Sequence, residues 1–159
     1  NPSNLRIDMA NTQAMCTSFK GELLVGHHNF GTGVTRGSTA ADTFKAALYL
    51  DTATVNASTT AYSATNEVSG TGYTATGVTV TFGTAPSTSG TTAFVTPSAS
   101  ITYSAVTLST AFDAVLIYNS TQSNKAVSVH TFGSQTVTAG TFTLTMPVND
   151  ASTGLIRIA

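Results

Sequence analysis

The stretch Thr141-Phe-Thr-Leu-Thr-Met-Pro-Val148 decides the fold, because threonine alternates along it with apolar residues. Successive side chains of an extended strand point to opposite faces, so one face is apolar and the other carries hydroxyls. The predicted inward face consists of Phe142, Leu144, Met146 and Val148. The predicted outward face consists of Thr141, Thr143 and Thr145. This is the pattern of a half-buried β-strand, and β-branched threonine suits its pleated surface.

The same alternation recurs along most of the chain after residue 40. The segment Phe112–Tyr118 instead has large apolar residues at both parities, as expected of a central strand covered on both sides. A hairpin loop is expected at 119–124. The predicted strands are 43–51, 72–83, 91–96, 99–108, 111–119, 125–133, 135–138, 141–148 and 154–159. Their connections are too short for helical crossovers, so we predict an antiparallel β-sandwich or barrel.

One α-helix is expected near the N-terminus, at about 12–28. Met15, Phe19, Leu23 and His27 recur there every four residues, Asn11 or Thr12 can cap the start, and Gly26 or Gly31 can end it. A single helical turn is expected within 60–70. Residues 1–10 lack periodicity and are interpreted as an extended arm, followed by a single domain over 11–159.

Charge is scarce in this chain. It has 6 basic and 7 acidic residues among 159, a net charge of −1, and no cluster of cations that could neutralise nucleic-acid phosphates. No apolar run is long enough for a membrane span, and no signal peptide is evident. We therefore expect neither a nucleic-acid partner nor a membrane partner. Cys16, beside Met15 and Phe19, is expected to be buried.

Candidate catalytic or metal-binding groups are scattered. His27 and His28 are adjacent and would diverge on a helix, while His130 stands alone in a strand. The carboxylates lie mostly at element ends, where caps and turns explain them. Residues 31–37 depart from a phosphate-binding loop. A sugar-stacking surface of Tyr62, Tyr73, Tyr103 and Tyr118 is possible, although core tyrosines are the more common arrangement. We expect no catalytic site, no metal and no cofactor.

Five segments together resemble the capsid cement, or decoration, proteins encoded in the head region of tailed bacteriophages. They are 14–24, 42–49, 65–73, 116–119 and 150–158. The resemblance implies a jelly-roll-like β-fold in a non-enzymatic protein. It implies binding to the outer surface of the assembled capsid, where the protein would bridge neighbouring major capsid subunits. The implied location is the virion, after synthesis in the cytoplasm of the bacterial host.

Two further expectations concern partners. Few charges or prolines guard the predicted strand edges, so we expect a homo-oligomer, either a dimer or a trimer, in addition to the major capsid protein. In the arm, Leu5, Ile7 and Met9 alternate with polar residues that include Arg6. We predict that these four residues contact the capsid as an added strand, and the alternative is that the arm is a disordered tail. The alternative function is a carbohydrate- or receptor-binding β-module of a phage tail or fibre.

Overall fold

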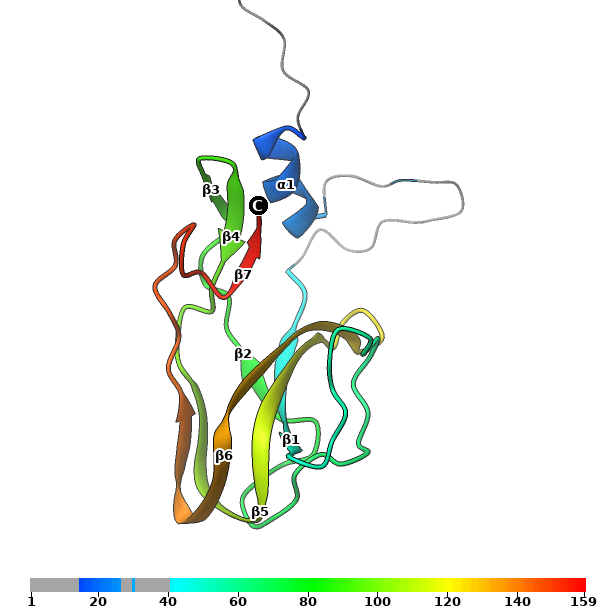
Figure 1. Ribbon diagram of the computed structural model, residues 1–159, viewed down its shortest axis with the longest axis vertical. Coiled ribbons are helices and arrows are strands. Elements are labelled where there is room, and N and C mark those ends of the chain that lie inside the picture. The colour runs from blue at the N-terminus through cyan, green and yellow to red at the C-terminus, as the bar shows by residue number, and fades with distance from the viewer. Residues whose placement is uncertain (1–14, 27–29, 31–40) are drawn as a thin grey trace, which may run out of the picture.

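The computed structural model describes residues 15–26, 30 and 41–159, and strands dominate it (Figure 1). One sheet has four strands in the order β2-β1-β5-β6, and the other has three in the order β3-β4-β7; all pairs are antiparallel. The elements are α1 (Thr17–Leu24), β1 (Phe44–Leu50), β2 (Val78–Val80), β3 (Ser87–Ser89), β4 (Thr92–Val95), β5 (Ile101–Asn119), β6 (Lys125–Leu144) and β7 (Ile156–Ile158). The prediction of a mainly β protein is confirmed, with two antiparallel sheets that are consistent with a sandwich.

Strands β5 and β6 form one long, bent hairpin instead of the five shorter strands expected from the sequence. The turn between them falls where it was predicted, and Ser123 and Asn124 adopt left-handed φ values of 55° and 58° there. Register shifts interrupt the pairing, and Ala105 (φ 52°) and Ala139 (φ 42°) lie at two of these irregularities. Because β-bulges bend a strand, the hairpin can fold back over its own sheet (Figure 1).

The folded-back hairpin encloses the main core. Phe142, in the returning half of β6, packs edge-on against Phe112 at a ring-centroid distance of 5.0 Å. The fully buried side chains beside them include Leu48 of β1 and Leu108 of β5. Burying apolar surface in this way is the main source of stability for a protein with so few charges.

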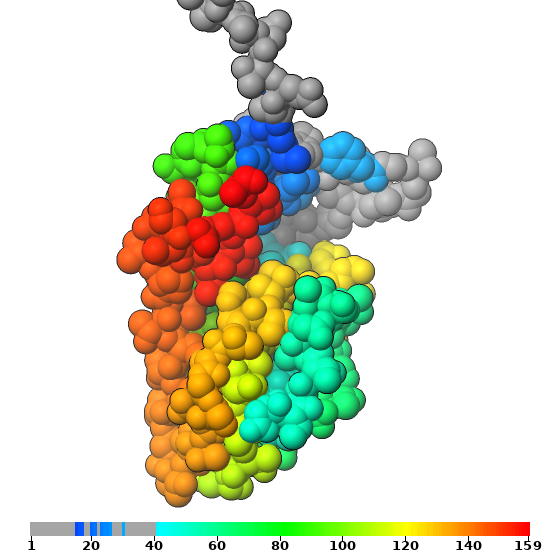
Figure 2. Space-filling view, viewed as in Figure 1, coloured from blue at the N-terminus to red at the C-terminus, as the bar shows by residue number. Residues whose placement is uncertain are grey.

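A second, smaller core lies on the opposite face of β1 and β5. Tyr49, Leu116 and Tyr118 are buried there under the loop of residues 51–77. Figure 2 shows this loop in teal and green over the yellow part of the β5–β6 hairpin. The prediction that Phe112–Tyr118 is covered on both sides is confirmed.

The stretch that predicted the fold behaves largely as expected. Phe142, Leu144 and Met146 pack against the main core, whereas Thr141, Thr143 and Thr145 are exposed. Val148 was expected on the inward face, and this is wrong because its side chain is 70% exposed. Strand β6 ends at Leu144, and Pro147 has no N–H with which to continue a ladder.

Helix α1 lies against the three-stranded sheet at one end of the molecule (Figure 1). Gly21 faces Thr88 of β3, and the Lys20 ammonium donates a hydrogen bond to the Thr91 carbonyl at 2.6 Å. The helix ends at Leu24, before Gly26, one of the two glycines expected to end it, which has a φ of 73°. The predicted bounds of 12–28 are too wide, because residues 15–16 and 25–26 are not helical. The expected caps Asn11 and Thr12, with His27, lie outside the described residues. Cys16 is exposed, so its predicted burial is wrong.

A close backbone approach fixes the start of β2 beside β1. Gly77 has a φ of 78°, and a Cβ atom at this position would lie 1.8 Å from the carbonyl oxygen of Ala46. Only glycine satisfies both conditions. The helical turn predicted within 60–70 is wrong, because that segment consists of turns and isolated bridges, including one between Tyr49 and Glu67.

Candidate functional site

Several residues singled out from the sequence cannot be placed. The predicted capsid-binding residues Leu5, Arg6, Ile7 and Met9 lie outside the described residues, as do His27, His28 and the glycine-containing loop 31–37. Within 15–26, 30 and 41–159, no group of three histidine, cysteine or acidic residues is arranged to hold a metal ion.

His130 is the one histidine whose surroundings are described. Its Nε2 lies 2.9 Å from the Ser128 hydroxyl oxygen, two residues earlier on β6. Burial lowers the pKa of His130, so the ring is neutral near pH 7 and could accept that hydroxyl proton. In the described part of the chain no carboxylate hydrogen-bonds to the ring, so the pair lacks the orienting group of a serine triad.

Asp42 and Asp150 each accept hydrogen bonds from a different part of the chain. Asp42 accepts hydrogen bonds from Asn119 Nδ2 at 2.7 Å and Gln122 Nε2 at 3.3 Å, which ties it to the β5–β6 turn. Asp150 accepts three hydrogen bonds within its own turn, from the Ser152 amide and from the Thr153 amide and hydroxyl. These bonds, those of Thr153 first, lower the pKa of Asp150. Neither carboxylate faces a second one as in a glycosidase pair.

Glu67 is the centre of a hydrogen-bonded network that joins the loop 51–77 to the sheet. Its carboxylate accepts hydrogen bonds from the Tyr62 hydroxyl at 2.5 Å, the Tyr73 hydroxyl at 2.7 Å and the Thr76 amide at 2.9 Å. The Tyr73 oxygen in turn accepts from the amide of Leu48 in β1 at 3.0 Å. Since each of these groups has a partner in the protein, the network positions the loop against the sheet.

The other three tyrosines complete this arrangement. The Tyr49 hydroxyl donates to the Ser63 carbonyl at 2.6 Å, Tyr103 to Ala46 at 2.8 Å, and Tyr118 to Thr76 at 2.7 Å. All five tyrosines of the chain therefore donate their hydroxyl protons inside the protein. Sequence reasoning missed this network, whose only signal was a lone glutamate among tyrosines.

The tyrosines do not form the possible sugar-stacking surface. Tyr103 and Tyr118 are 2% and 1% exposed. Their rings stack on other tyrosines, Tyr118 on Tyr62 at 4.9 Å and Tyr103 on Tyr73 at 5.9 Å. The alternative arrangement, tyrosines in the core with satisfied hydroxyls, is the one observed.

Among the described residues, β6 is a long strand at the edge of the four-stranded sheet. Topology leaves β6 paired on one side only, and from Ala126 to Leu144 it contains no Asp, Glu, Lys, Arg or Pro. Its beginning is covered, because the Ala126 amide donates to the Thr60 carbonyl at 3.0 Å. Bulges such as that at Ala139 interrupt the rest, and bulges are a common protection of edges in place of charge.

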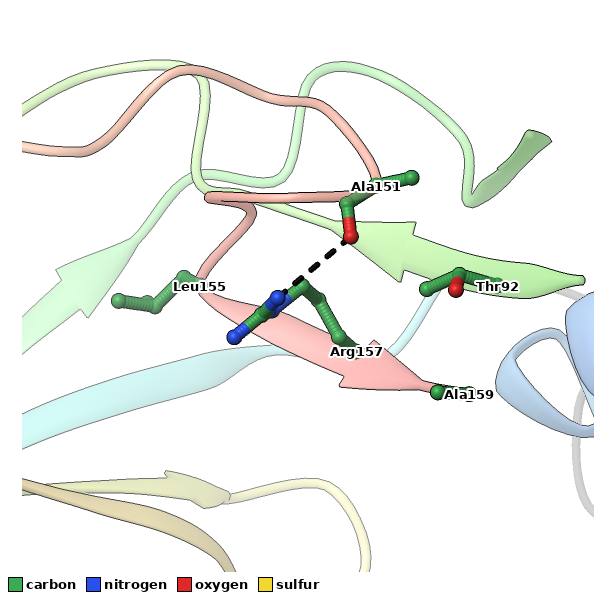
Figure 3. A pocket seen from close by; sticks show the side chains of 5 residues that line it. All are labelled: Thr92, Ala151, Leu155, Arg157 and Ala159. Carbon is green, nitrogen blue, oxygen red and sulfur yellow. Dashed lines mark hydrogen bonds between the residues drawn. The ribbon is translucent and has the colours of Figure 1, made fainter. Parts of the chain in front are cut away.

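A hollow of about 360 Å³ lies beside the other sheet, at β7 (Figure 3). It is lined by Thr92, Ala151, Leu155, Arg157 and Ala159. The Arg157 Nη1 group donates to the carbonyl of Ser152 at 2.6 Å and to that of Ala151 at 3.5 Å. Arg157 is the only arginine among the described residues, and no sequence pattern singled it out.

Comparison of the chain with protein-family models, with curated proteins and with solved structures found no match. Among the residues that the structure describes, no helix has the length and apolar character needed to cross a membrane.

Proposed function

We propose that the protein is a capsid cement protein of a tailed bacteriophage, without enzymatic activity. It would bind the outer surface of the assembled head as a homo-oligomer and bridge neighbouring major capsid subunits. The sequence segments that resemble decoration proteins suggest this role. A jelly-roll-like arrangement of the two sheets is the finer form of the fold that the proposal assumes.

The observation that carries the proposal is the surface of the β5–β6 hairpin. Thr102 of β5 pairs with Thr143 of β6 in the bent hairpin, and both side chains are exposed together with Thr141 and Thr145. A surface coated with hydroxyls has little net charge and a low desolvation cost compared with ionised groups. Such a surface suits a contact that is repeated many times over a shell, where many modest interfaces add up.

The tail-module alternative receives less support. Aromatic platforms are a common means of binding sugars through their apolar faces, but Tyr103 and Tyr118 are buried and Tyr62 and Tyr73 stack on them. Copy number separates the two functions, because cement covers a shell whereas a tail module is present in few copies.

The proposal is tested by heating heads with and without the protein. Heads of the encoding virus assembled without this chain should break at a lower temperature than complete heads, and the purified protein should restore their resistance. The same assay examines the arm: a variant lacking residues 1–8 should fold normally but bind and protect heads less well. Unchanged heat resistance without the protein would contradict the cement function. Full protection by the truncated variant would instead exclude only the arm as the capsid-binding segment. The contact with the capsid would then lie on the β-sheet part of the protein.

A further inference from the structure

The hollow at Arg157 lies on the face of the three-stranded sheet that points away from α1. Gly21 of α1 faces Thr88, and Thr88 pairs with Ala93, so the helix covers the face that holds these side chains. Arg157 pairs with Phe94, the next residue of β4, and so lies on the opposite face. The guanidinium is therefore not covered by the helix.

Hydrogen bonds hold the Arg157 guanidinium in place but use only some of its N–H donors. Both of its hydrogen bonds to the carbonyls of Ala151 and Ser152 come from Nη1. A guanidinium has five N–H donors in a fixed fork, and those on Nε and Nη2 have no acceptor among the described residues. Two free, parallel donors on a guanidinium match a carboxylate, which they can bind through both oxygens.

The described charges at this site are those of Arg157 and Asp150, and Arg157 is the one with N–H donors still free among the described residues. Asp150, close enough to interact electrostatically with Arg157, already directs its Oδ1 to the Ser152 and Thr153 donors. Among the other described cations, the Lys20 ammonium is buried against a carbonyl, the Lys45 ammonium donates to the Thr76 hydroxyl at 3.1 Å, and Lys125 is exposed at the β5–β6 turn. Arg157 is thus the described cation that stands in a hollow.

The hollow also adjoins a free strand edge. In the order β3-β4-β7, strand β7 is paired only with β4 among the described residues, so within this part of the chain its other side presents unpaired backbone donors and acceptors. Thr92 contributes a hydroxyl group to the lining and Leu155 an apolar wall. An extended segment added along β7 could place one side chain in the hollow while its backbone extends the sheet.

We propose that this hollow binds the side-chain carboxylate of an aspartate or glutamate in an extended segment of a partner protein, which pairs with the free edge of β7. Charge complementarity at Arg157 selects the acidic side chain, and the edge of β7 selects the extended backbone. The inference stands apart from the proposed capsid function, because it specifies the chemistry of the partner and not its identity.

The test is a nuclear magnetic resonance titration of the full chain with capped peptides. One peptide has the sequence threonine-valine-glutamate-valine-threonine, a second has glutamine in place of glutamate, and sodium acetate supplies a free carboxylate. The glutamate peptide should shift the Arg157 Nε–H resonance and the amides of 156–158, and should bind about ten-fold more tightly than the glutamine peptide. Acetate should act only at much higher concentration.

Variants make the assignment specific. Arg157→Gln should remove the preference for glutamate, and Arg157→Lys should retain only part of it, because lysine keeps the charge but loses the fork. Lys125→Gln, which removes an exposed cation at the β5–β6 turn, should leave the preference unchanged. Unchanged amide positions elsewhere in each spectrum establish that the variant is folded. Equal affinity for the two peptides, acetate as effective as the glutamate peptide, or shifts away from β7 would each overturn the inference, as would the absence of binding.

Discussion

The Tyr103 hydroxyl donates a hydrogen bond to the carbonyl oxygen of Ala46 at 2.8 Å, although the two residues lie 57 positions apart. Tyr103 belongs to the half of β5 that folds back, and Ala46 belongs to the middle of β1. The bond therefore joins the two layers that the bent hairpin creates. Both residues are buried, so no water replaces the hydroxyl if it is removed.

Replacing this hydroxyl should measurably destabilise the fold. We expect Tyr103→Phe to lower the free energy of unfolding by about 1–3 kcal/mol, because a buried carbonyl loses a partner while the ring packing is kept. Thr102→Ala, at the exposed neighbouring position, should change it by less than about 0.5 kcal/mol. Urea denaturation measures both values. A loss for Tyr103→Phe no larger than that for Thr102→Ala would mean that the bond does not hold the layers together.

The close approach at Gly77 can be separated from its backbone conformation. Gly90 also has a positive φ, 58°, but a Cβ atom there would meet nothing within 4 Å. Gly90→Ala should therefore cost only the conformational strain, roughly 1–2 kcal/mol. Gly77→Ala adds a clash with the Ala46 carbonyl and should cost about 4 kcal/mol or more. Similar thermal stabilities for the two variants would show that the backbone relieves the clash easily.

The alternation of threonine and apolar residues gives a third prediction. Leu108 is fully buried in the main core, so Leu108→Ala should cost about 2–5 kcal/mol. Leu144 is only partly buried, and Leu144→Ala should lie near the lower end of that range. Thr143→Ala, on the exposed face, should change stability by less than about 0.5 kcal/mol. Chemical denaturation of the three variants tests this order, and a loss at Thr143 equal to that at Leu144 would contradict the assigned faces.

The tyrosines predict how stability depends on pH. Burial, reinforced for Tyr62 and Tyr73 by the hydrogen bond to Glu67, raises the pKa of all five above the ordinary value of 10.0. The folded protein then retains protons that the unfolded chain releases, so this stability is complete below about pH 10 and falls as the pH rises above it. Each tyrosine contributes a slope of up to about 1.4 kcal/mol per pH unit.

The ultraviolet absorbance of phenolate tests this prediction. It should stay low as the pH passes 10 and then rise steeply as the protein unfolds, at the same pH at which the circular dichroism changes. Independent ionisation near pH 10 in a protein that remains folded would contradict the tyrosine network. Glu67→Gln should weaken the effect at Tyr62 and Tyr73 while Tyr103, whose hydroxyl bonds to Ala46, retains most of it.

Local sequence patterns predicted most of the strands. The features that were not predicted depend on pairing between residues far apart in the chain. The two apolar parities of Phe112–Tyr118 correctly indicated a doubly covered strand, because burial on each side requires them. Strand β3 was missed since Ser87–Ser89 has no apolar residue, and its strand conformation comes from pairing with β4. The predicted helical turn in 60–70 failed because the Glu67 and Tyr62 anchors hold that segment against the sheet.

The candidate sites were also not predicted, because they too are built by residues far apart in the chain. Nothing local distinguishes Arg157 from any surface cation, because its hollow depends on β4 and on the loop that carries Ala151. The five tyrosines converge only once β5 has folded back and the loop 51–77 has crossed the sheet. The hydroxyl-rich surface, in contrast, was visible in the sequence as threonines alternating with apolar residues.

The proposed function requires this protein to cover a phage head, so the number of copies bound per head is its sharpest test. Purified protein is mixed with heads of the encoding virus that lack it, the particles are recovered by density gradient, and the bound chains are counted against the major capsid protein by quantitative mass spectrometry. A cement protein should saturate the heads at a fixed, simple ratio to the capsid subunits, with many copies spread over each shell. Failure to bind heads, or binding of only a few copies confined to the tail, would contradict it.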